Sequence, residues 1–109
     1  MLYAEDLRTA IISASTSGDN TIIAAPVDGY IAIDHINFVP TTAVAVKFIS
    51  GSTDKSGTYP LDAKQPITLE NAMQSIKGVI TCGKNEAFII NLGGAIAING
   101  FIRYRVVGA

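Results

Sequence analysis

The sequence predicts an all-β protein, an antiparallel β-sandwich of about eight short strands. Three observations predict this class. Apolar residues alternate with polar or small ones over short runs, as in strands buried on one face. Turn-forming residues separate these runs at intervals of about 8 to 12 residues. No convincing long helix is present, so the crossover helices that a parallel sheet needs are missing.

The clearest strand pattern lies in the second of two central runs, residues 29–40 and 41–52. Val44, Val46 and Phe48 stand two residues apart, so one face of a pleated strand carries all three. The two runs meet at a Pro-Thr-Thr corner, and we expect them to form the centre of the sandwich.

The first central run is less regular. Ile31 and Ile33 share a face, but the next apolar residues, Ile36 and Phe38, have the opposite parity. A β-bulge near residues 34–35 would bring both pairs to the same side of the sheet.

The other expected strands are shorter and are bounded by turn formers. They cover residues 9–14, 21–25, 58–62, 67–70, 79–82 and 87–92, and a last stretch in which residues 95–98 and 99–100 lead into 101–107. Turns or loops are expected at residues 15–20, 51–57, 71–78 and 93–94. Pro60 cannot donate a backbone hydrogen bond, so its strand suits a sheet edge. Residues 1–10 are interpreted as an N-terminal arm and residues 11–109 as one sandwich domain.

The composition favours a protein that associates with other proteins over one that catalyses a reaction. The 109 residues are 49% hydrophobic and only 16% charged, which is little charge for the surface of so small a domain. We therefore expect a homo-oligomer, a dimer or trimer, or docking on a larger partner.

The net charge of −1 argues against nucleic acid as a partner, and no run approaches the about 18 apolar residues of a membrane span. One cysteine excludes an intrachain disulfide, and synthesis in a reducing cytosol is expected.

No catalytic or metal-binding pattern is evident. His35 is the one histidine and Cys82 the one cysteine, and no second ligand stands at metal-site spacing. A surface or structural role for His35 and a buried, unreactive Cys82 are the simpler interpretations. We expect no enzyme activity, no cofactor and no metal. Tyr30, Tyr59 and Tyr104 could stack on a sugar only if the fold placed them together.

Candidate partner contacts lie near both ends of the chain. In the last strand Ile102 and Tyr104 are expected to face inward, with Arg103 and Arg105 facing outward. These arginines, with Arg8, would pair with acidic groups on a partner, or would simply be solvated. The arm, which contains Leu2 and Tyr3, would add contact area if it ordered on docking.

Several segments resemble the small virion proteins of tailed bacteriophages. The resemblance is carried by Ser-Gly-Asp-Asn-Thr at residues 17–21, Ser-Gly-Ser-Thr at 50–53 and Asn-Leu-Gly-Gly-Ala-Ile-Ala at 91–97, and it spans roughly residues 15–107. It leaves out the arm and departs from the pattern between residues 60 and 77.

The resemblance implies a jelly-roll-like sandwich that decorates and cements a capsid exterior. The implied partner is the major capsid protein, and the implied location is the virion surface after synthesis in the host cytoplasm. A carbohydrate- or receptor-binding module of a phage tail or fibre is the alternative.

Overall fold

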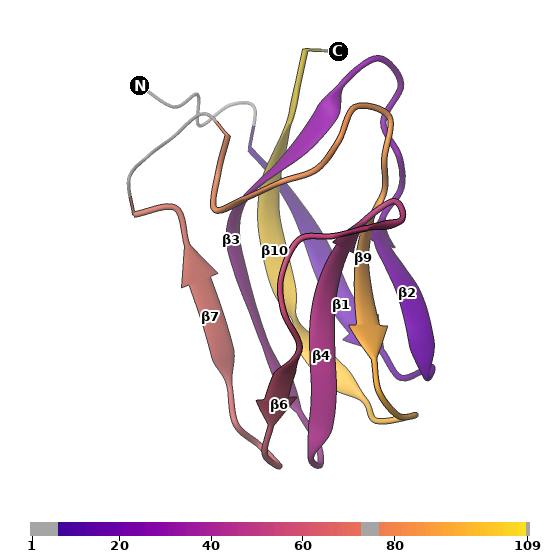
Figure 1. The fold of residues 1–109 in the computed structure, drawn as a ribbon. Helices are drawn as coiled ribbons and strands as arrows, with labels where there is room; N and C mark the ends of the chain where they lie inside the picture. Colours follow the sequence, from indigo (N-terminus) through magenta and orange to yellow (C-terminus); the bar gives the residue numbers. More distant parts are fainter. Residues whose placement is uncertain (1–6, 73–76, 109) are drawn as a thin grey trace.

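Two antiparallel five-stranded sheets pack face to face in the computed structural model, which describes residues 7–72 and 77–108 (Figure 1). Sheet A contains β1 (Arg8–Ala14), β10 (Ile98–Val107), β3 (Tyr30–Pro40), β7 (Ile67–Glu70) and β8 (Ile80–Thr81). Sheet B contains β2 (Gly18–Ile23), β9 (Phe88–Leu92), β4 (Val44–Ser50), β5 (Thr53–Asp54) and β6 (Tyr59–Leu61). The predicted β-sandwich is confirmed.

The chain passes repeatedly from one sheet to the other. Sheet A has the order β1-β10-β3-β7, with β8 also on β3, and sheet B has the order β2-β9-β4-β5, with β6 also on β4. The first and last strands therefore lie side by side, and β3 and β4 each lie inside their sheet. This connectivity is jelly-roll-like.

The core fills the space between the sheets. Val44, Val46 and Phe48 are buried on one side of β4, as their spacing predicts. The Phe48 ring lies between two other buried rings, at centroid distances of 6.1 Å from Phe38 and 5.9 Å from Phe88. Because these aromatic residues come from both sheets, their contacts hold the layers together.

A bulge in β3 preserves the core across the parity change. His35 lies opposite Arg103 of β10, while the next pair joins Ile33 to Tyr104, so Asp34 is the extra residue. Ile33 and Ile36 are consequently both buried. The predicted bulge at residues 34–35 is confirmed, and its physical effect is to give Asp34 an orientation that no regular strand position provides.

One predicted turn is too long and the last strand begins earlier than expected, because strand pairing extends into both segments. β2 begins at Gly18, opposite Leu92, and ends at Ile23, so the turn expected at residues 15–20 is limited to residues 15–17. Residues 99–100 lie inside β10, where Gly100 faces Phe38 of β3 at very close range. The absence of a side chain at Gly100 permits this approach, so the glycine serves strand packing there.

The boundary of the predicted arm also changes. β1 begins at Arg8, so residues 8–10 belong to sheet A, and residues 1–6 lie outside the described part of the chain. The expected loop at 51–57 contains the two-residue strand β5. Within the expected loop at 71–78, residues 73–76 also lie outside the described part. Pro60 lies in β6, whose partner is β4, in agreement with an edge position.

Candidate binding surface

The outward side of sheet A carries an apolar and aromatic strip beside a cation. Strand register places Ile11 of β1 opposite Phe101 of β10, and Phe101 opposite Asn37 of β3. In the next row, Arg103 lies opposite His35. The neighbouring residues Ile12, Ile36 and Ile102 are buried, so the alternation of the pleat turns these five side chains away from the core. We call them the sheet A face: Ile11, His35, Asn37, Phe101 and Arg103.

Apolar side chains on the outward side of sheet A are unusually exposed to solvent. Ile11 is 78% exposed in the middle of a strand, and Val39, on the same side of β3, is 37% exposed. Arg103 is exposed, and its guanidinium carbon lies 5.9 Å from the centre of the Phe101 ring. An apolar strip flanked by a cation suits contact with another macromolecule better than contact with water.

His35 is held by three neighbours. Its ring stacks on Phe101 at 5.2 Å and 25°. Its Nδ1 lies 3.2 Å from Glu70 Oε1, and its Nε2 lies 2.8 Å from Asn37 Nδ2. A neutral ring with the proton on Nδ1 satisfies both contacts, because Nδ1–H donates to the carboxylate and Nε2 accepts from the amide. The contacts fix the orientation of the ring on the sheet surface.

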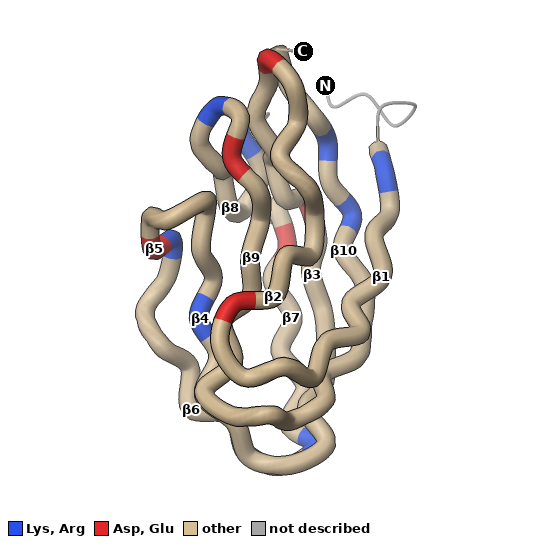
Figure 2. Tube along the Cα trace, turned by 90° about the vertical axis from the view of Figure 1, so that its right-hand side faces the viewer, with Lys and Arg blue, Asp and Glu red and all other residues tan. Residues whose placement is uncertain are grey.

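Three of the predicted contact residues lie on the neighbouring strands β1 and β10, where Figure 2 shows basic positions, but they do not form one exposed group. Arg8 has the same parity as Ala10 and Ile12, which pack on the core, so it lies on the other side of the sheet from Arg103. Arg8 lies opposite Tyr104 and is exposed, and Arg103 is exposed on the sheet A face. The other two, Leu2 and Tyr3, lie outside the described residues.

Arg105 corrects the prediction of an outward, accessible arginine. It shares the outer side of β10 with Arg103, yet it is only 2% exposed. Its Nη2 lies 3.3 Å from Oδ1 of Asp34, the bulge residue, and Asn71 Nδ2 donates to the same oxygen at 2.9 Å. Because this ion pair is inside the fold, Arg105 supports the domain and is not part of the exposed contact surface.

A second polar cluster joins the two sheets near the end of β4. Ser50, 1% exposed, donates to Glu86 Oε1 at 2.7 Å and accepts from the Gly83 backbone N–H at 2.8 Å. Added side chains at Gly51 and Gly83 would collide with Glu86, so both glycines make room for it. Sequence reasoning missed this cluster, although a serine that ends a run of core residues was a usable signal.

Cys82 lies beside this cluster and is 3% exposed. Burial raises the pKa of its thiol, partly offset by a hydrogen bond with Ser50. A thiol that is buried and harder to ionise is a poor nucleophile, in line with the expectation for this residue.

Among residues 7–72 and 77–108, no group of three or more His, Cys, Asp or Glu side chains is placed to hold a metal ion.

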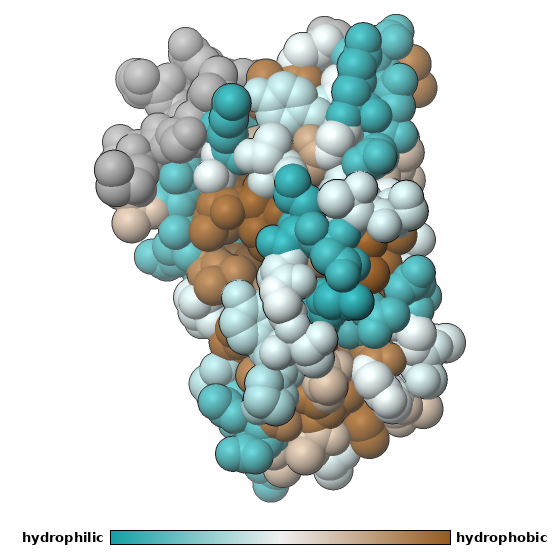
Figure 3. Space-filling view, viewed as in Figure 1, coloured by the Kyte–Doolittle hydropathy of each residue, from teal (hydrophilic) through white to brown (hydrophobic). Residues whose placement is uncertain are grey.

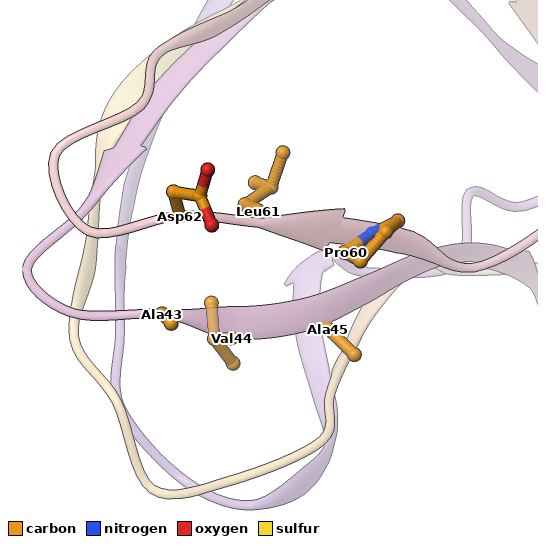
Figure 4. A pocket seen from close by; sticks show the side chains of 6 residues that line it. All are labelled: Ala43, Val44, Ala45, Pro60, Leu61 and Asp62. Atoms are coloured by element: carbon orange, nitrogen blue, oxygen red, sulfur yellow. The ribbon is translucent and has the colours of Figure 1, made fainter.

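Sheet B carries a shallow pocket beside β6. Six residues of β4, β6 and their ends line a volume of about 330 Å³ (Figure 4): Ala43, Val44, Ala45, Pro60, Leu61 and Asp62. Asp62 is the one charged residue of the lining. In the view of Figure 3, over β4 and β6, hydrophilic residues break the hydrophobic surface into separate patches. This pocket lacks the converging polar groups of a specific ligand site.

The three tyrosines in the described part of the chain do not share one sugar-stacking platform. Tyr104 packs against the core, and Tyr59 lies in sheet B, where its ring is 5.8 Å from that of Phe48. Tyr30 begins β3 in sheet A.

Comparisons with known proteins found no matching family model, no similar curated protein and no similar solved structure. Within the described ranges, no helix is long and apolar enough to cross a membrane.

Proposed function

We propose that this chain is a structural protein that decorates and cements the exterior of a bacteriophage capsid. It acts as a homo-oligomer bound non-covalently to the major capsid protein. The phage assignment rests on the resemblance of residues 15–107 to small virion proteins. The mode of action rests on the sheet A face.

The observation that carries the proposal is the combination of Ile11, Phe101 and Arg103 on one open face. Aromatic residues and arginine are enriched where protein interfaces hold most of their binding energy. An open sheet surface offers contact area without a cleft, which is what bridging between capsid subunits needs. Arg103 calls for an acidic group on the capsid surface, since it is the exposed cation of this face.

Repetition of the binding site on the shell raises the overall affinity of such a contact. An icosahedral shell repeats each binding site many times, and a preformed oligomer that holds two sites gains from effective concentration. A modest contact per copy is therefore sufficient to stabilise the shell.

Binding to purified shells tests the proposal. Capsid shells of the encoding phage, prepared without this protein, are mixed with the full chain and sedimented. We expect the chain to sediment with the shells at a fixed stoichiometry and to raise their thermal stability. Arg103→Glu should weaken binding about tenfold, or roughly 1.4 kcal/mol.

Lys84→Glu is the matched control, because it makes the same charge change at an exposed turn away from the sheet A face. Its binding should equal that of the unmodified chain. Failure of the unmodified chain to bind the shells would refute the capsid assignment. Equal weakening by both variants would refute the role of the sheet A face.

A further inference from the structure

β1 forms one edge of sheet A and pairs with β10 through all seven of its residues without a register shift. In Figure 2 it forms the right-hand border of the sheets. Alternate residues of an edge strand direct their backbone N–H and C=O groups away from the sheet, where they can bind another strand. After Arg8, residues 9–14 contain no charge, no proline and no glycine.

The opposite edge of sheet A and both edges of sheet B carry features that prevent strand addition. On sheet B, β2 begins with Gly18 and Asp19 and has a register shift after Thr21. The Asn20 side chain also donates to the Gly18 carbonyl at 3.1 Å, so one backbone acceptor at the start of β2 is already engaged. The other edge of sheet B consists of β5, with two residues, and β6, with Pro60 at its centre. On sheet A, β7 has four residues and β8 two. Short strands, charge, proline and bulges are the usual protection of sheet edges.

We propose that β1 pairs antiparallel with β1 of a second copy, forming a symmetric dimer with one continuous sheet. The occupant is a second copy because an edge strand that crosses a two-fold axis is complementary to itself. Backbone hydrogen bonds supply the attraction, as in other cases of strand addition.

The full seven-residue overlap fixes the register. Ile11 meets Ile11 of the partner at the axis, Thr9 meets Ser13, and Arg8 meets Ala14. Equal parity keeps each pair on one face of the joined sheet. The two arginines lie at opposite ends of the ladder, so like charges do not meet. Ile11, which is 78% exposed in the single chain, gains an apolar cross-strand neighbour.

This inference deepens the proposed function and rests on it in one respect, the homo-oligomer that cementing requires. Joining two sheets at Ile11 extends the sheet A face of each copy into one strip, with Phe101 next to Ile11 on both sides of the axis. The dimer would then present a doubled apolar surface to the capsid.

Solution mass of the purified full chain tests the dimer without any capsid, so its failure is distinct from failure of shell binding. We expect a mass twice that of the 11.4 kDa chain by light scattering. Ile11→Lys should give a monomer, because two lysines would meet at the axis, where residues 9–14 otherwise carry no charge. Thr21→Lys, an exposed outward position on the edge strand β2, should remain a dimer. A monomeric or trimeric unmodified chain would overturn the proposal.

Disulfide trapping tests the register and does not depend on weakening the dimer. Under oxidised glutathione, Ile11→Cys should cross-link to a covalent dimer, because cross-strand Cβ atoms lie about 4.5–5.5 Å apart. Ser13→Cys is the control, since two copies of position 13 would be separated by four residues, about 14 Å. The buried Cys82 should leave the unmodified chain uncross-linked. Efficient cross-linking through position 13 and none through position 11 would contradict the register.

Discussion

The outward faces of the two sheets are built differently. On sheet B, polar side chains pair with each other: Lys47 with Asp54 at 3.3 Å, and Asn91 with Asp19 at 2.7 Å. On sheet A, His35 likewise pairs with Asn37 and Glu70, but Ile11 is exposed in mid-strand and Arg103 lies over an aromatic ring. Sheet B thus resembles an ordinary solvated surface, whereas sheet A also exposes an apolar side chain in mid-strand, which the proposed docking would cover.

Within sheet A, the residues that stabilise the fold differ from those proposed to bind a partner. Sheet A contains its own internal ion pair, Asp34 with Arg105, only a short distance along β10 from the exposed Arg103. One strand face therefore holds an arginine that maintains the fold and one that is free to bind. Single substitutions can test which residues stabilise the fold and which bind a partner.

The largest effect is expected from Gly100→Ala in sheet A. The added methyl would overlap the Asn37 carbonyl and the Phe38 backbone, so β10 and β3 would have to separate. We expect a loss of more than about 3 kcal/mol in the free energy of unfolding, measured by urea denaturation. Gly57→Ala, which meets no atom within 4 Å, is the control and should change stability by about 0.5 kcal/mol or less. A small effect at Gly100 would contradict the close strand approach.

Arg105→Ala should lower stability by about 2–3 kcal/mol. The substitution leaves the Asp34 carboxylate without its buried cation and removes a packed side chain. Arg103→Ala, on the same side of the same strand, should change stability by about 0.5 kcal/mol or less but should weaken shell binding. Equal loss of stability in the two variants would refute the division of roles between them.

Ser50→Ala tests the connection between the sheets and should cost about 2 kcal/mol. It removes the hydroxyl that donates to Glu86 and accepts from Gly83, and so leaves buried partners unsatisfied. Ser52→Ala, at an exposed position in the same segment, is the control. Thermal unfolding of both variants measures the difference, and unchanged stability in Ser50→Ala would contradict the hydrogen-bonded cluster.

The smallest effect is a pH dependence from Cys82. Burial raises the pKa of the folded thiol, whereas the unfolded thiol ionises near its ordinary value of about 8.5. Above that value the unfolded state loses its proton first, so stability should fall as the pH rises and level off above the folded pKa. Urea titrations at neutral and alkaline pH should show a steeper decline for the unmodified chain than for Cys82→Ala. Parallel declines would contradict the buried position of the thiol.

Much of the fold could be predicted because strand periodicity is local. The burial of Val44, Val46 and Phe48 follows from their spacing. The bulge at residues 34–35 follows from the parity change between two apolar pairs. Strand ends were less predictable, since Gly18 and Gly100 resemble turn residues until a partner strand is placed against them.

The sheet A face was only partly predictable for a similar reason. The outward orientation of Arg103 and Arg105 follows from alternation along β10, but their different exposure does not. The grouping of Ile11, His35 and Phe101 depends on register between strands that are far apart in the sequence.

By itself, the sequence determined which side of each strand is apolar, because alternation is a property of the extended backbone. It also determined where β3 needs a bulge. Only the tertiary structure decided which outward residues are covered, which edge lacks protection, and which side chains from distant strands meet. These depend on neighbours that the chain acquires only when the two sheets close on each other.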